Sequence, residues 1–160
     1  MLTVIGCGNP TRSDDGVGPW VVRALHDRLG DLALPQVQLF DAGTDGMSVM
    51  FRARGTTQLI VIDACRSGSA PGTVYAVPGK ELAAPPEASL NLHDFRWNHA
   101  LHAGRQIYKD AFPEDVTVYL IESETLDYGV GLSAAVERAA SDVADRIEEL
   151  IRNLEPGASA

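Results

Sequence analysis

The sequence predicts one α/β domain, a three-layer sandwich with a mainly parallel central sheet flanked by helices. Strand-like and helix-like segments alternate along the chain, and no shift in composition divides it. The 160 residues are 45% hydrophobic, which is enough apolar material for one buried core. We therefore expect a single domain over residues 1–154, followed by a flexible tail at 155–160.

The first part of the chain predicts two strands and two helices. Residues 1–5 are apolar and β-branched and indicate a strand, and Gly6 and Gly8 then allow the backbone to turn. A second strand is expected at 37–40, before the turn DAGTDG and a short helix at 47–53. The first helix lies between these strands, and its apolar positions recur at three- and four-residue steps: Val17, Val21, Val22, Leu25 and Leu29.

The middle of the chain contains the clearest strand, residues 57–64, with the sequence TQLIVIDA. Its continuous apolar run is typical of a strand that is covered on both faces of a sheet. A strand at 72–77 is expected to lie beside it, and residues 78–91, rich in Pro, Ala and Glu, indicate a surface loop. A helix at 94–111 and a strand at 116–123 follow.

The last predicted helix starts at Ser133, a residue type that favours the N-cap position. Glu and Arg residues occupy one side of this helix, as expected for a face in contact with water. Its apolar face is formed by Val136, Ala140, Val143, Ile147, Leu150 and Leu154.

Composition excludes several classes of function. The formal net charge of -9 disfavours nucleic acid or an anionic membrane as partner, because both require a basic surface. No apolar run approaches the roughly 20 residues of a membrane helix, and the chain opens directly into a strand without a signal peptide. Cys7 and Cys65 alone cannot supply a disulfide framework or a thiolate zinc site. We expect a soluble cytoplasmic protein, monomeric because no long exposed apolar stripe is evident.

Two adjacent carboxylates, Asp14 and Asp15, follow the first strand within IGCGNPTRSDDGVG. Residues at the carboxyl end of a strand face the ligand site of open α/β sheets. One Asp is well explained as a cap at the start of a helix, but two like charges in one turn repel each other. We expect one carboxylate to cap the helix and the other to face a cleft that suits a cation.

Asp63 and Asp41 hold equivalent places after two other strands. Asp63 closes the apolar run LIVID, where a carboxylate is costly unless it is paired, bound to a metal or used to cap the next turn. Asp41 begins DAGT, a sequence that also makes an ordinary Asx turn.

Three histidines lie close together in NLHDFRWNHALHAGR. His93 is expected at the start of a helix, where it can face a cleft. His99 and His102 are three residues apart and share one helical face. This spacing alone is a weak indication of a metal site, because most helical histidines have structural roles.

The glycine pattern Gly6-Cys7-Gly8 allows a second hypothesis, a nucleotide-binding oxidoreductase. Thr11 stands where a dinucleotide fingerprint requires its third glycine, and Asp41 is only a loose candidate for the acidic residue that contacts the ribose. The Asp14–Asp15 pair would also repel a pyrophosphate.

The chain resembles the hydrogenase maturation proteases, endopeptidases that trim the C-terminus of the [NiFe]-hydrogenase large subunit. The resemblance extends from the first strand to the last helix. It rests on the ordered combination of GCGNPTRSDDGVG, DAGTDGM, LIVIDACRSGSAPGTV and HDFRWNHALHAGR.

The resemblance implies that Asp15, Asp63 and His93 bind nickel, and that Asp41 takes part in processing. This chain has Leu-His-Asp-Phe where many family members have Ser-His-Gly-Leu or Pro-His-Gln-Leu. His93 keeps the following helix in register with similar members, whereas the fallback, His99, shortens that helix by nearly two turns.

The implied activity is removal of the C-terminal extension from a nickel-loaded large-subunit precursor. Two carboxylates and one imidazole form an incomplete shell, so nickel held by the precursor can be recognised there. We expect metal-assisted hydrolysis, with the ion polarising the scissile carbonyl or activating water. Asp41 and Asp14 are both candidates for the base. The alternative is a non-catalytic nickel-sensing or escort protein that uses the same three ligands.

Overall fold

The computed structural model describes residues 1–30, 34–82 and 96–154, and these form one five-stranded sheet. Four strands run parallel and the fifth, at one edge, is antiparallel to its neighbour. In spatial order the strands are β2 (Val37–Gly43), β1 (Leu2–Cys7), β3 (Gln58–Cys65), β5 (Asp115–Glu122) and β4 (Val74–Pro78).

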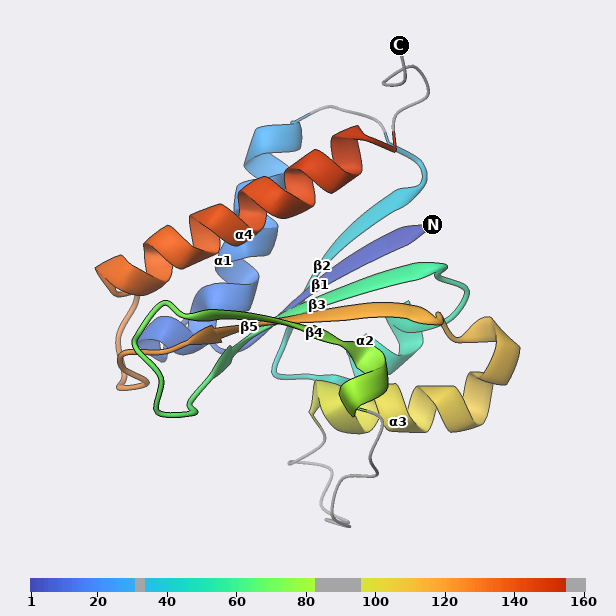
Figure 1. The fold of residues 1–160 in the computed structure, drawn as a ribbon, viewed down its shortest axis with the longest axis horizontal. Helices are drawn as coiled ribbons and strands as arrows, with labels where there is room; N and C mark the ends of the chain where they lie inside the picture. The colour runs from blue at the N-terminus through green and yellow to red at the C-terminus, as the bar shows by residue number, and fades with distance from the viewer. Residues whose placement is uncertain (31–33, 83–95, 155–160) are drawn as a thin grey trace.

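Helices cover both faces of the sheet, so the predicted three-layer α/β sandwich is confirmed (Figure 1). The longest helix, α4, packs with α1 on one face, and α2 packs with α3 on the other. The helices are α1 (Val17–Leu29), α2 (Gly46–Ala53), α3 (Trp97–Tyr108) and α4 (Ala134–Arg152), with short 3-10 turns η1 (Ser13–Gly16), η2 (Gly79–Leu82) and η4 (Lys109–Ala111).

Helix α4 begins after Ser133, as its sequence predicts, and buries one apolar face. The buried face differs from the prediction at its C-terminal end. Ile151 is fully buried, whereas Leu150 is only partly buried and Leu154 lies beyond the helix with 38% of its surface exposed. A helical period of 3.6 residues places Ile151, four residues after Ile147, on the sheet side.

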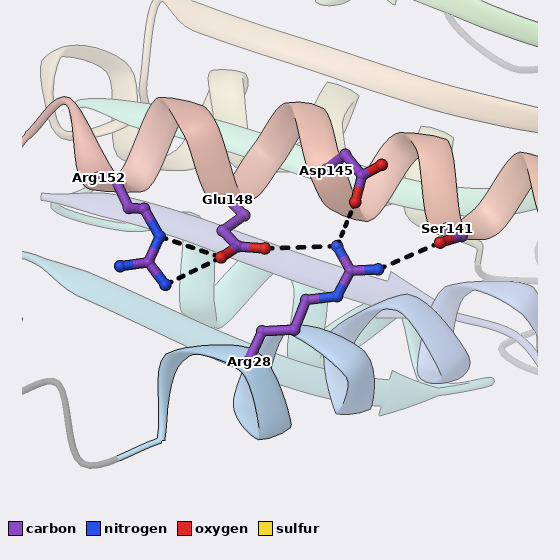
Figure 2. A network of polar contacts seen from close by, with 5 residues as sticks. All are labelled: Arg28, Ser141, Asp145, Glu148 and Arg152. Atoms are coloured by element: carbon purple, nitrogen blue, oxygen red, sulfur yellow. Dashed lines mark hydrogen bonds and ion pairs between the residues drawn. The ribbon is translucent and has the colours of Figure 1, made fainter.

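Arg28 links the two helices of this layer through their polar edges (Figure 2). Its guanidinium contacts Asp145 at 2.5 Å, Glu148 at 3.3 Å and the Ser141 hydroxyl at 3.1 Å, all on α4. Arg152 donates to the same Glu148 carboxylate at 3.0 Å. Four side chains of α4 therefore form one network with the last turn of α1.

The strand expected at 72–77 does not lie beside β3, and this prediction is wrong. β4 pairs only with β5, in the antiparallel direction, and β5 occupies the place next to β3. The physical reason is burial: β5 carries more buried positions than β4, whose residues are exposed or half-buried. β5 takes the interior place, and β4, which ends in Pro78, forms the edge, where a residue without a backbone N–H is tolerated.

Helix α3 begins at Trp97. The start predicted from the sequence, residue 94, lies outside the described residues. The helix ends at Tyr108, earlier than predicted, because Lys109 has a φ of +47° and the chain continues as η4. Most of the loop expected at 78–91 and the whole tail at 155–160 also lie outside the described residues. In the part of the chain that is described, no helix has the length and apolar content needed to cross a membrane.

Two close approaches of the backbone position the end of β1. A Cβ on Gly6 would lie 2.3 Å from the carbonyl oxygen of Gly18, so the strand and α1 touch through two glycines. Gly8 has a φ of +132°, and a Cβ there would lie 1.8 Å from the carbonyl oxygen of Asp15. The turn after β1 therefore folds tightly against η1, which carries the Asp14–Asp15 pair.

Candidate functional site

A cleft of about 90 Å³ opens at the carboxyl ends of β1, β2 and β3. The N-terminal ends of α2 and α3 form its other walls. This is the edge at which open parallel sheets bind ligands. The side chains that give the cleft its chemistry are Asp15, Asp45, Asp63, Cys7, Arg96 and Trp97.

Asp15 faces this cleft from η1, as the sequence predicts for one member of the pair. Its Oδ2 atom accepts the backbone amide of Asn9 at 2.9 Å. The Oδ1 atom accepts no hydrogen bond from the described residues. One oxygen thus fixes the side chain, and the other is open to a ligand.

Asp63 reaches the same cleft from β3. Its Oδ1 atom accepts the Ala64 amide and its Oδ2 atom accepts the indole Nε1–H of Trp97, both at 2.8 Å. Burial raises the pKa of the Asp63 carboxyl to about 7, although the Trp97 and Ala64 hydrogen bonds oppose that rise. The nearby carboxylate of Asp15 also raises it. The two predicted ligands therefore lie within electrostatic range of each other, at a place that favours a cation.

Asp14 has a different role from the predicted helix cap. No side chain caps η1 or α1, and the N-cap of α1 is Gly16. Asp14 is fully buried, and its carboxylate accepts four hydrogen bonds: from the amides of Glu124, Thr125 and Ser133, and from the Ser133 hydroxyl. It ties the turn after β1 to the loop before α4. Because Asp14 is fully buried and does not line the cleft, it is not placed to act as a general base there.

Asp41 lies near the end of β2 with an exposed side chain, outside the residues that line the cleft. Its Oδ1 atom accepts the Gly43 amide at 2.9 Å, which is the Asx turn that the sequence also allows. Its charge still contributes to the electrostatics of the cleft, because it helps to raise the pKa of Cys7.

The structure does not describe His93, which lies in the segment 83–95. His99 lies in the first turn of α3, and its Nδ1 atom accepts the Arg96 amide at 3.1 Å. Neither His99 nor His102 lines the cleft. The structure thus gives the fallback His99 a local role at the start of its helix.

Sequence reasoning missed three cleft residues. Asp45 is the N-cap of α2: its carboxylate accepts the Met47 amide at 3.0 Å and the Ser48 hydroxyl at 2.6 Å, which lowers its pKa. Its place before a helical segment was a readable N-cap signal. Arg96 and Trp97 had no such signal, because they are brought to β3 only by the tertiary fold.

The surroundings of both cysteines favour the protonated thiol. Burial strongly raises the pKa of Cys7, with further contributions from Asp63 and Asp41. Burial and the neighbouring Glu122 carboxylate raise the pKa of Cys65 to about 12. A thiolate is the reactive form, so neither side chain is prepared for attack on a peptide bond.

Over the described ranges, no three His, Cys, Asp or Glu side chains lie close enough to hold a metal ion by themselves. Asp15 and Asp63 supply two carboxylates of the hard, oxygen-donor kind. A pair of carboxylates is an incomplete ligand set for a metal ion.

Comparisons with known proteins identify the family. The family model described as hydrogenase maturation protease matches residues 19–150. The chain is 29% identical over 153 residues to the hydrogenase 2 maturation protease of Escherichia coli, a match that covers 94% of this chain and 90% of that protein. It is 26% identical over 156 residues to the hydrogenase expression/formation protein HoxM of Cupriavidus necator, with 95% and 74% covered.

Solved structures show the same fold. The hydrogenase maturating endopeptidase HybD from E. coli superposes with a TM-score of 0.75 at 25% identity, covering 95% of this chain and 92% of that one. The maturation protease HycI from Thermococcus kodakarensis shares the fold with a TM-score of 0.76 at 17% identity, covering 95% and 92%. The fold and the matches place this protein among the hydrolases, as an endopeptidase. More narrowly, the chain belongs to the hydrogenase maturation protease family.

Proposed function

We propose that this protein removes the C-terminal extension of a nickel-loaded [NiFe]-hydrogenase large-subunit precursor. The observation that carries the proposal is the convergence of Asp15 and Asp63, from two separate strand ends, on one cleft. Family membership supplies the class of reaction, cleavage of a peptide bond. The two carboxylates supply a reason why cleavage would depend on a metal ion.

The proposed recognition uses oxygens that the fold leaves available. Among the described residues, Asp15 Oδ1 has no donor and each oxygen of Asp63 accepts one hydrogen bond, so a second lone pair remains on each. We assign the third ligand to His93 on the family resemblance alone. His93 precedes Trp97, a residue of the cleft wall, by four positions in the sequence.

Nickel belongs to the substrate in this proposal, held by the precursor, and it would polarise the scissile carbonyl or activate water. The residues of this chain orient the ion and exclude a part of the solvent around it. Asp63 is held between Trp97 and Ala64, so its carboxylate cannot rotate away. Asp41, exposed at the end of β2, is proposed to act on the incoming peptide at the rim of the cleft.

The structure bears differently on the two alternatives. A nucleotide-binding oxidoreductase would have to place a pyrophosphate next to Asp15, Asp45 and Asp63, three carboxylates in one cleft. A nickel escort protein would use the same ligands without cleavage, and only an activity measurement separates it from a protease.

The test is intact-mass spectrometry of a nickel-loaded large-subunit precursor before and after incubation with the protein. We expect the wild type to remove one C-terminal peptide, and the Asp15→Asn variant to leave the precursor intact. Asp142→Asn is the matched control, because Asp142 is an exposed acidic residue on α4, away from the cleft. An unchanged precursor mass with the wild type would contradict the protease and favour the escort protein.

A further inference from the structure

The two most exposed large apolar side chains of the described residues belong to one loop. Tyr128 and Val130 expose 82% and 90% of their surface, and both lie between β5 and α4. Single exposed apolar residues are common, but two that flank one glycine at the tip of a loop form a small apolar knob. We call Tyr128 and Val130 the loop knob.

The loop knob is held in place rather than free to move. Between its two residues, Gly129 donates its amide to the Thr11 carbonyl and accepts the Ser13 amide, both at 2.9 Å. The Ser13 hydroxyl also donates to the Asp127 carbonyl at 2.8 Å.

Arg12 adds two contacts to this anchoring. Its Nε atom donates to the Leu126 carbonyl at 3.3 Å, and its guanidinium lies 4.4 Å from the centre of the Tyr128 ring. A loop with this many contacts presents its side chains in one arrangement, so a partner that binds it orders little additional chain.

The same turn connects the loop knob to the cleft. Residues 11–14 hold the loop, and the next residue, Asp15, lines the cleft. The loop also lies at the carboxyl edge of the sheet, beyond the end of β5 (Figure 1). A protein that inserts its C-terminal tail into the cleft would meet the loop knob with the body of its fold.

We propose that the loop knob docks against an apolar patch on the folded body of the hydrogenase precursor; this rests on the proposed function. A cleft of about 90 Å³ holds only a short segment of the precursor. Selection of one precursor therefore requires contacts outside the cleft. Tyr is among the residue types that contribute most to binding at the centres of interfaces, and Val130 extends its apolar surface.

The proposal is tested by measuring both binding and cleavage of the same nickel-loaded precursor. The loop-knob variant combines Tyr128→Ser with Val130→Ser. A second variant, Val130→Ser alone, removes one apolar side chain but keeps the stacking of Arg12 on Tyr128. The matched control is Phe51→Ser combined with Ile107→Ser, because these side chains are 59% and 62% exposed on α2 and α3. We expect the loop-knob variant to raise the Kd and the KM for the precursor about tenfold or more, with kcat unchanged. The control should leave both constants at the wild-type value.

The outcomes separate this proposal from the proposed function. Wild-type cleavage with equal KM for the wild type and the loop-knob variant would overturn the docking surface and leave the protease intact. Binding that depends on the loop knob without any cleavage would support docking and contradict the protease. A wild-type dimer that the loop-knob variant converts to a monomer would overturn the proposal, since a second copy of this chain would then be the partner. Absence of wild-type binding to the precursor would also overturn it.

Discussion

Two identical neighbours, Asp14 and Asp15, have divided roles because of the direction in which each side chain points. Asp14 is buried and accepts four hydrogen bonds from the loop before α4, whereas Asp15 accepts one and faces the cleft. The sequence alone predicts that the pair divides its roles. It does not predict that the buried member anchors a loop 110 or more positions away, because that contact depends on the tertiary fold.

This division of roles predicts that one alanine variant mainly loses stability and the other mainly loses activity. Asp14→Ala should lower the free energy of unfolding by about 4 kcal/mol or more, since it leaves four donors without their acceptor and each such buried donor costs about 1–3 kcal/mol. Asp15→Ala should change it by less than about 1 kcal/mol while abolishing processing. Urea denaturation of both variants measures the difference. Equal losses of stability would contradict the assigned roles.

Asp63 predicts a pH dependence of stability, because its pKa of about 7 in the folded protein exceeds the ordinary value of 3.8. Between these values the folded carboxyl keeps its proton and the unfolded one loses it, so the folded state becomes less favourable as pH rises from about 4 to 7. One pKa unit corresponds to about 1.4 kcal/mol, so the loss of folding stability over this pH range is at most about 4 kcal/mol.

The Asp63→Asn variant isolates this effect, since every other titrating group is common to both proteins. We expect the free energy of unfolding of the wild type, minus that of the variant, to fall as pH rises from 4 to 8. Chemical denaturation at several pH values provides the measurement. A difference that does not change with pH would show that burial does not raise the pKa of Asp63.

Trp97 is predicted to position Asp63 for its ligand. Trp97→Phe keeps an aromatic ring in the cleft wall but removes the Nε1–H that donates to Asp63 Oδ2. Loss of such a supporting hydrogen bond should lower kcat/KM for the nickel-loaded precursor about tenfold. Intact-mass spectrometry of the precursor at successive times measures this rate, with Trp20→Phe as control, because Trp20 packs on the opposite layer against the α1–α4 core. An equal effect of both substitutions would contradict a specific role for Trp97.

At the scale of the elements, local patterns predicted the strands and helices, but not all of their neighbours. The strands at 2–7, 37–43, 58–65 and 115–122 all carry apolar runs that the sequence displays. The predicted partner of β4 was wrong because its apolar sequence, VYAVP, does not by itself distinguish an interior strand from an edge strand. Its place depends on the pairing of β5 with β3, which is decided across the whole sheet. Trp97 and Arg96 were missed in the cleft for a related reason: their contacts lie far away in sequence.

Arg28 joins α1 to α4, and its removal is predicted to have a modest effect. Partly exposed ion pairs contribute little, so Arg28→Met should lower the free energy of unfolding by about 1 kcal/mol. This loss of stability should be smaller at high salt, because salt screens the ion pairs of Arg28 in the wild type. Thermal unfolding at low and high ionic strength tests this, and a loss that is independent of salt would assign the effect to packing of the Arg28 stem.

At the scale of the whole molecule, the fold brings chemistry from three strand ends and two helix starts to one edge. The sheet order places β1, which leads to Asp15, between β2 and β3, which carry Asp41 and Asp63. The family resemblance implies this meeting of Asp15 and Asp63, and the fold explains it, since carboxyl ends of parallel strands share one edge. Asp41 lies at the same edge of the sheet but outside the cleft. It belongs to β2, the outermost strand, and the Asp41 side chain is exposed.

The central claim is that the Asp15–Asp63 cleft makes cleavage depend on nickel in the precursor. The most direct measurement is intact-mass spectrometry of one precursor prepared with and without nickel, each incubated with the wild type and with Asp63→Asn. We expect the wild type to remove the C-terminal extension from the nickel-loaded precursor alone, and the variant to leave both forms intact. Equal cleavage of the nickel-free precursor by the wild type would contradict the claim.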